Sequence, residues 1–100
     1  MVTYRESEMA DKFVEYLIKD QGYPKESIAV EYDVGKNNYV DIAILDLKTR
    51  TPIQLFELKG KKTKETEERG KKQLKKYRSL TDNQSIPAYL IFLNDNEPYF

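Results

Sequence analysis

A chain of 100 residues fits one domain with a single modest core, and 39% hydrophobic with 34% charged residues indicates folding rather than disorder. The absence of cysteine and histidine excludes disulfides, thiolate metal sites, a histidine-based catalytic triad and an ordinary zinc centre. Any bound metal would therefore have oxygen ligands. The formal net charge is zero. No apolar run reaches the roughly 18 residues of a membrane span and no signal peptide opens the chain, so we expect a cytoplasmic protein with no membrane partner.

The first part of the chain predicts a helix and then a strand. A helix over residues 6–20 has one apolar face, which contains Met9, Phe13, Tyr16 and Leu17. Gly22 and Pro24 follow and end it. A short strand is predicted at residues 28–32, and residues 35–38 supply the turn before the next strand.

The remaining elements are two strands, a helix and a last strand. Residues 39–47 and 53–59 predict strands joined by the polar turn 48–51. A second helix is expected over residues 64–80, with a sparse apolar stripe made of Gly70, Leu74 and Tyr77. Residues 86–93 predict a fourth strand that is nearly all apolar, which indicates a central position in its sheet.

The order α-β-β-β-α-β predicts an α/β fold. The short turns indicate that the first three strands form an antiparallel meander. The second helix would then cross over and add the fourth strand, which gives a mixed four-stranded sheet flanked by helices. No linker or repeat divides the chain, so residues 1–100 are predicted to form a single domain. The aromatic residues at its end, Tyr99 and Phe100, suggest a fragment of a longer chain.

Charged residues interrupt two of the predicted strands. Asp41 lies inside an apolar run, and Glu57 and Lys59 end the next run. Such charges are costly unless they are paired or hold a metal. Two carboxylates and an ammonium group on neighbouring strands would make a Mg²⁺ site with a lysine beside it, which suits phosphodiester hydrolysis. The alternative is a fraying strand end with Asp41 paired to a lysine.

The alternation of side chains along a strand predicts how these groups point. Glu57 and Lys59 share one face of their strand, as joint action on one metal and one water requires. On the preceding strand, Asp41 is expected to share its face with Ala43 and to point away from Val40.

A basic segment follows the lysine of this set. From Lys59 to Arg78 there are ten basic residues and three glutamates, a local charge of +7, which leaves −7 on the other residues. Such a concentrated positive charge is compatible with a polyanionic partner. The alternative is a lysine-rich helix face that serves only to contact water.

The combination resembles a known superfamily of nucleases. Asp41 followed by Glu57-x-Lys59 on consecutive strands, in the order α-β-β-β-α-β, resembles the PD-(D/E)XK nucleases with their restriction-endonuclease-like core. Gln73 and Tyr77 match the Gln-x-x-x-Tyr signature of one branch, which includes the N-terminal nuclease domain of type I restriction enzyme motor subunits. Residues four apart share a helix face, so both side chains can point towards the end of the sheet.

The N-terminal half adds a further match to that branch. Glu8 and the segments 15–18, 22–25 and 29–31 are similar to the opening of the type I restriction nuclease domain. The resemblance covers nearly all of the chain. Val40 replaces the proline of the superfamily's name, and the family domain usually continues past the fourth strand.

The resemblance implies a set of metal ligands. Asp41 and Glu57 would bind Mg²⁺, with the backbone carbonyl of Leu58 as a third ligand. Glu8 would add a carboxylate from the first helix, and Glu15 on the same helix is the alternative. Mn²⁺ is expected to substitute for Mg²⁺.

Further roles follow from the same resemblance. Lys59 would orient the attacking water and stabilise charge on the phosphate. Gln73 and Tyr77 would position Lys59 or contact the DNA backbone, although a solvated glutamine and an ordinary core tyrosine are the simpler interpretations. The expected nucleic-acid contacts are Lys61, Lys62, Lys64, Lys72 and Lys76.

The resemblance implies a Mg²⁺-dependent deoxyribonuclease domain, an endonuclease rather than an exonuclease. No base-reading motif is visible, so we expect little intrinsic sequence specificity. The partners would be DNA and the helicase or motor and specificity subunits of a restriction complex. The alternatives are a catalytically inactive nucleic-acid-binding or assembly module of the same fold, and a nuclease that acts on RNA or branched DNA.

Overall fold

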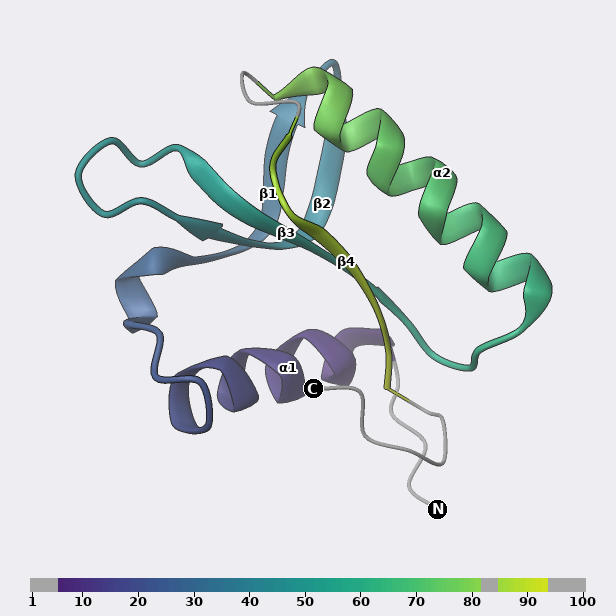
Figure 1. The fold of residues 1–100 in the computed structure, drawn as a ribbon. Coiled ribbons are helices and arrows are strands. Elements are labelled where there is room, and N and C mark those ends of the chain that lie inside the picture. Colours follow the sequence, from purple (N-terminus) through teal and green to yellow (C-terminus); the bar gives the residue numbers. More distant parts are fainter. Residues whose placement is uncertain (1–5, 82–84, 94–100) are drawn as a thin grey trace.

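The computed structural model describes residues 6–81 and 85–93 of the chain (Figure 1). The predicted order α-β-β-β-α-β is confirmed, with one short 3₁₀ helix added before the first strand. The elements are α1 (Glu6–Lys19), η1 (Lys25–Ser27), β1 (Ile28–Gly35), β2 (Asn38–Leu45), β3 (Pro52–Lys59), α2 (Lys64–Leu80) and β4 (Ala88–Phe92). The aromatic end of the chain, Tyr99 and Phe100, lies outside the described residues.

The four strands form one mixed sheet in the order β1-β2-β3-β4. The β1–β2 and β2–β3 pairs are antiparallel and the β3–β4 pair is parallel, as expected for a meander followed by a helical crossover. The central position predicted for β4 is wrong, because β4 is an edge strand in the described part of the chain. Its residues are apolar because helices cover both of its faces: Leu90 packs towards α2 and Ile91 towards α1.

The two helices cover opposite faces of the sheet and make two separate cores (Figure 1). The α1-side core consists of Met9, Phe13, Leu17, Ile42, Ile44, Phe56, Leu58 and Ile91. The α2-side core consists of Val40, Ala43, Leu45, Leu55, Leu74, Tyr77 and Ile86. The apolar stripes predicted for both helices are therefore the faces that they bury. Neither described helix is long and apolar enough to cross a membrane.

The sequence of α2 defines its start and its close approach to the sheet. Thr63 caps the helix by accepting a hydrogen bond from the amide of Thr66 at 3.0 Å, and the Thr66 hydroxyl accepts one from the Thr63 amide. One turn further, a Cβ atom on Gly70 would lie 2.5 and 2.7 Å from the two terminal carbons of Leu90. The glycine thus lets α2 lie directly on β4.

Strand β2 departs from regular alternation at Asp41. Ala43 packs in the α2-side core and Ile42 in the α1-side core, as alternation requires. Val40 should then join Ile42, yet it packs with Ala43 in the α2-side core. The prediction that Asp41 shares its face with Ala43 and points away from Val40 therefore fails at Val40, because the strand bends at Asp41.

A pair of leucine substitutions tests the assignment of the core. Leu55→Ala removes a side chain that is 0% exposed and should lower the free energy of unfolding by about 2–5 kcal/mol. Leu47→Ala alters a side chain that is 52% exposed and should change it by less than about 0.5 kcal/mol. Urea unfolding followed by circular dichroism measures both values, and equal losses would contradict the described packing.

Candidate active site

The candidate site lies where β2 and β3 separate. The two strands pair from Leu45 opposite Pro52, through a register shift after Ile44, to Ile42 opposite Phe56. Asp41 and Glu57 are the next residues on each strand, and there the backbone ladder ends. Side chains take over the hydrogen bonds that the ladder would otherwise supply.

These hydrogen bonds are reciprocal. The backbone amide of Leu58 donates to Oδ2 of Asp41 at 2.7 Å. The backbone amide of Asp41 donates to Oε1 of Glu57 across a longer distance of 3.4 Å. Each acid thus accepts from the backbone of the neighbouring strand, so both have a structural role that the sequence did not predict. Buried amides need such acceptors wherever strands diverge.

Glu57 is the most strongly perturbed of the described acids. Its side chain is almost fully buried, at 4% exposure. Burial raises the pKa of its carboxyl group to about 7, and the charge of Asp41 and a hydrogen bond with the Asp41 side chain add to the increase. Lys59 opposes this effect on the pKa only in part, because its Nζ lies 3.8 Å from Oε2 of Glu57. Two facing carboxyl groups with a distant ammonium make a place where an additional cation would be stabilised.

The donor set is compatible with a hard divalent cation. Asp41 and Glu57 supply carboxylate oxygens, which Mg²⁺ and Mn²⁺ prefer. The described residues contain no group of three acidic side chains arranged to hold a metal. The carboxylate ligands available at this site are therefore Asp41 and Glu57. Mg²⁺ commonly keeps several water ligands and needs only one or two protein carboxylates, so the pair is sufficient for it.

Helix α2 brings the Tyr77 hydroxyl close to the acid pair. Burial raises the pKa of the Tyr77 hydroxyl, and the charges of Glu57 and then Asp41 raise it further, which places the hydroxyl near both acids. One turn earlier, Oε1 of Gln73 is buried and has no hydrogen-bond partner among the described residues. Buried polar atoms without partners are rare in folded proteins and point to a functional contact or a bound water.

A cavity of about 660 Å³ opens beside Asp41. Its walls come from the start of α1, the middle of β1 and the ends of β2 and β3; the residues are Met9, Ala10, Asp11, Val30, Glu31, Asp41 and Leu58. The first helix thus reaches the site as expected. The acid that it contributes to the cavity wall is Asp11, while Glu8 is exposed and does not line it. Glu15 is also exposed and pairs with Lys19 at 3.1 Å.

Asp11 and Glu31 were not singled out from the sequence. A helical wheel places Asp11 on the exposed side of α1, where an acid is unremarkable. Counting back from the turn at Lys36 and Asn37 would have placed Tyr32 opposite Asp41. The register shift between Asp33 and Gly35 places Glu31 there instead, so the sequence carried no signal for it.

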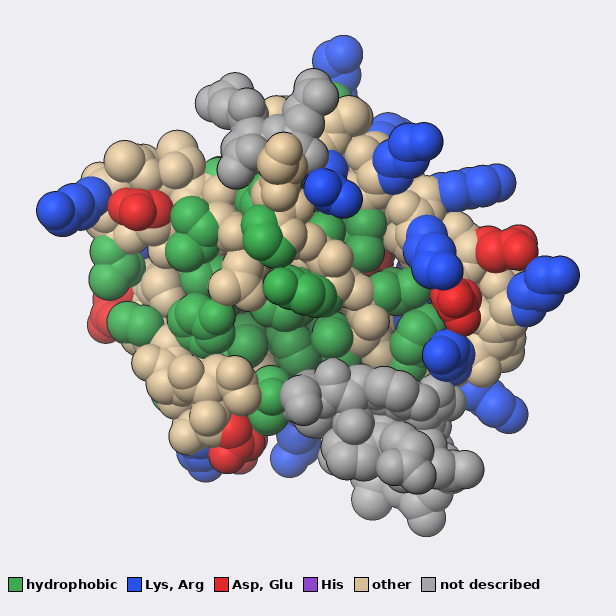
Figure 2. Space-filling model, in the orientation of Figure 1, with side chains coloured by type: hydrophobic (Ala, Val, Ile, Leu, Met, Phe, Trp, Pro, Cys, Tyr) green, Lys and Arg blue, Asp and Glu red, His purple; other side chains and the backbone are tan. Residues whose placement is uncertain are grey.

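The basic segment forms an exposed surface of α2 and the loop before it. Figure 2 shows the blue lysine and arginine side chains that gather along α2, on the right of the view. The five predicted contact residues, Lys61, Lys62, Lys64, Lys72 and Lys76, are all exposed. Glu65 and Glu67 pair with Arg69 and Lys71 at 2.7 and 2.9 Å. These acids therefore neutralise neighbours on the helix, and Lys72 and Lys76 have no ion pair within the described residues.

The element order, with an acid–acid–lysine set at the split between β2 and β3, resembles that of a nuclease-like domain of the PD-(D/E)XK class. The chain belongs to the family described as the type I restriction enzyme R protein N terminus (HSDR_N), whose family model matches residues 5–99. This match confirms the resemblance found in the sequence. No curated protein and no solved structure matches the chain.

The raised pKa of Glu57 predicts a pH-dependent stability. Because its folded pKa of about 7 exceeds the ordinary 4.5, wild-type protein should lose stability relative to Glu57→Gln as the pH rises from 4.5 to 7. Across that range the difference in the free energy of unfolding should shift in favour of the variant by on the order of 3 kcal/mol. Urea unfolding at several pH values measures this difference. Glu68→Gln, at an exposed position of α2, is the control, and its difference from wild type in the free energy of unfolding should not change with pH. If the difference between Glu57→Gln and wild type were also independent of pH, Glu57 would not be desolvated.

Proposed function

We propose that this domain hydrolyses DNA phosphodiester bonds with a divalent metal ion, as the nuclease domain of a restriction system. The observation that supports this most directly is the burial of Glu57 against Asp41, because a fold does not gain stability from burying one carboxyl group beside another. Carboxyl groups whose pKa is raised by burial and by a neighbouring charge, as that of Glu57 is, are concentrated at functional sites.

Asp41, Glu57 and the backbone carbonyl of Leu58 would hold Mg²⁺, with Mn²⁺ as a substitute. Glu8 remains a proposed additional ligand from α1. When bound, the ion supplies an activated water at neutral pH and stabilises the charge of the phosphate oxygens. The hydrogen bond from the Leu58 amide fixes Oδ2 of Asp41 and so orients the carboxylate before any ion arrives.

Lys59 would contact the phosphate that is cut. Its side chain is 20% exposed, and its ion pair with Glu57 is long, so the ammonium group is not committed to one partner. It can move to the scissile phosphate and orient a water beside it. The positive charge of its ammonium group suits stabilisation of a phosphate in the transition state.

Gln73 and Tyr77 would support this lysine or the DNA backbone. The raised pKa of Tyr77 means that its hydroxyl keeps its proton and can donate a hydrogen bond. The unpartnered Oε1 of Gln73 can accept one from an ammonium group such as that of Lys59. The two residues are four apart and so share a face of α2, and the Tyr77 hydroxyl on that face lies near the acid pair, which favours this function over core packing alone.

The exposed lysines of α2 and its preceding loop would bind the DNA backbone. These contacts are to phosphates, which carry no sequence information, so the domain would have little specificity of its own. The family description places such domains at the N terminus of R proteins of type I restriction enzymes. We therefore propose that recognition of the DNA sequence and movement along it belong to specificity and motor subunits, and that this domain acts as the endonuclease.

A second function rests on the hydrogen bonds at the site. Asp41 and Glu57 accept backbone amides, and this structural role would be the same in an inactive nucleic-acid-binding or assembly module. Such a module has no use for a divalent ion. The nuclease proposal therefore depends on whether the domain cleaves DNA and whether that cleavage requires a divalent metal ion.

Plasmid cutting tests the nuclease. Supercoiled DNA with Mg²⁺ or Mn²⁺ should be nicked and linearised, and EDTA should stop this. Asp41→Asn keeps an oxygen for the Leu58 amide but removes the charge, and Lys59→Ala removes the ammonium group; each should lower the rate by about 100-fold or more. Lys48→Ala, in the loop between β2 and β3, is the control. Cutting that survives both site variants would refute the assignment, and RNA and branched DNA run alongside would show the preferred substrate.

The salt dependence of DNA binding tests the basic surface. Fluorescence anisotropy with duplex DNA should give a logarithmic affinity that falls linearly with the logarithm of salt concentration. Lys72→Gln and Lys76→Gln should each reduce that slope by about 0.9 if the lysine contacts a phosphate. Lys48→Gln should leave the slope as it is. Identical slopes for all three variants would mean that α2 presents only a solvated face.

A further inference from the structure

A single residue inside β1 has a left-handed backbone. Glu31 has φ of +52°, a conformation that is costly for a residue with a Cβ atom. The other described non-glycine residues with positive φ are Lys36, Asn37 and Arg50, and all three lie in the connections between strands. Turns favour such angles, whereas a strand does not, so Glu31 needs a separate explanation.

The register of the sheet places this residue beside the candidate site. Val30 pairs with Ile42, and Tyr32 pairs with Val40. Glu31 is therefore the residue opposite Asp41. The one strained position within a described strand is thus next to the acid that leaves the β2–β3 ladder.

Both strands change their packing side at this position. Ala29 and Ala43, before the bend, pack with the α2-side core. Tyr32 and Val40, beyond it, pack with the same core. Tyr32 lies an odd number of residues from Ala29, and Val40 lies an odd number of residues from Ala43. Regular alternation would put them on the other face. Each strand has therefore lost one step of alternation at the paired positions 31 and 41.

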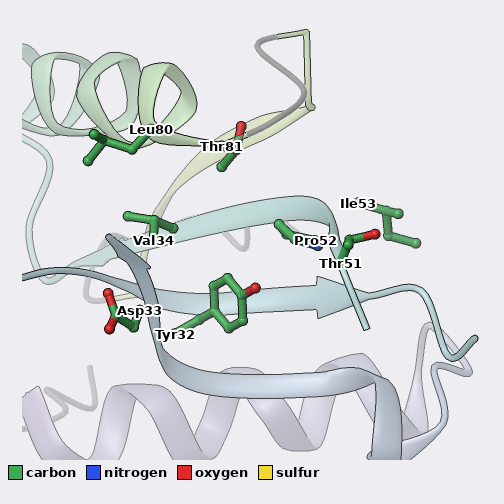
Figure 3. A pocket seen from close by; sticks show the side chains of 8 residues that line it. All are labelled: Tyr32, Asp33, Val34, Thr51, Pro52, Ile53, Leu80 and Thr81. Carbon is green, nitrogen blue, oxygen red and sulfur yellow. The ribbon is translucent and has the colours of Figure 1, made fainter. Parts of the chain in front are cut away.

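Beyond the bend, the β1–β2 hairpin folds over the end of α2. Figure 3 shows Tyr32 and Val34 on one wall of a cavity of about 370 Å³, with Leu80 at the end of α2 across from them. Pro52, at the start of β3, lies on the same cavity. The hairpin thus reaches elements that a straight pair of strands would pass by.

We propose that Glu31 is a positioning residue. Its left-handed backbone rotates the paired strand β2 at Asp41, so that the amide and the carboxylate of Asp41 point towards β3. The amide and the carboxylate of Asp41 both form hydrogen bonds with residues of β3, Glu57 and Leu58, and this requires the strand to be rotated at that point. In this proposal the Glu31 backbone acts and its carboxylate is dispensable. Its value for catalysis rests on the proposed nuclease function, but its effect on the geometry does not.

Substitutions at Glu31 separate the backbone from the side chain. Glu31→Gly removes the carboxylate and relaxes the backbone, Glu31→Gln keeps the strain without the charge, and Glu31→Val adds a β-branched side chain that resists positive φ. The readout is the Leu58 amide in ¹H–¹⁵N NMR spectra, because it donates to Oδ2 of Asp41. Titration with Mg²⁺ in the same spectra reports the site itself.

The glycine and glutamine variants should keep the hydrogen-exchange protection of the Leu58 amide within about threefold of wild type. The valine variant should lower it by about tenfold, as expected when a strained conformation becomes costlier. It should weaken Mg²⁺ binding in parallel. Equal loss in glycine and valine variants, or loss in the glutamine variant, would assign the effect to the carboxylate and overturn the proposal.

A glycine–alanine comparison decides the matter if the valine variant does not fold. Glu31→Gly should melt at a higher temperature than Glu31→Ala, because only glycine adopts positive φ without strain. At the neighbouring strand position, Val30→Gly should melt below Val30→Ala. The same order at both positions would overturn the proposal. If wild-type protein binds no Mg²⁺, the nuclease proposal fails, whereas the Leu58 amide and the melting order still test the bend.

Discussion

The separation of β2 from β3 depends on two carboxylates that replace backbone acceptors. Asp41 accepts the amide of Leu58 and Glu57 accepts the amide of Asp41, so each strand end is held by a side chain of the other. This exchange keeps the amides satisfied where the ladder stops and leaves two acids facing each other under α2. The raised pKa of Glu57, the nearness of Tyr77 and the cavity beside Asp41 are found at the same place.

The same acids therefore have a structural use and a proposed chemical one. Burying Glu57 destabilises its charged form, which is a disadvantage for a purely structural residue and an advantage for a cation site. The left-handed backbone of Glu31 on the adjacent strand β1 adds a second cost in stability at the same place. Functional sites commonly depart from the best local choice for stability, and two departures on paired residues agree with that rule. The family of type I restriction enzyme R protein N termini provides the setting in which such a site would act on DNA.

The elements of the fold and the main site residues could be predicted because their signals are local. Periodicity gave the buried face of α1 and the stripe of Gly70, Leu74 and Tyr77 on α2, and spacing singled out Asp41, Glu57 and Lys59. The position of β4 could not be read in this way, since a strand covered by two helices has the same composition at an edge as in the centre. The side on which Val40 packs depends on the bend at Glu31. This bend is a tertiary feature that the conformational propensity of glutamate does not predict.

Calorimetric titration of Mg²⁺ into the protein at pH 7, in two buffers of different ionisation enthalpy, tests whether the acid pair binds a divalent cation. With the pKa of Glu57 at about 7, the carboxyl pair holds a proton in part of the molecules, and a bound ion would displace it. We predict one Mg²⁺ site in wild-type protein, an apparent enthalpy that differs between the buffers, and loss of the site in folded Asp41→Asn. Absence of binding to folded wild-type protein, or equal binding by the variant, would contradict this prediction and leave the acid pair with its structural role alone.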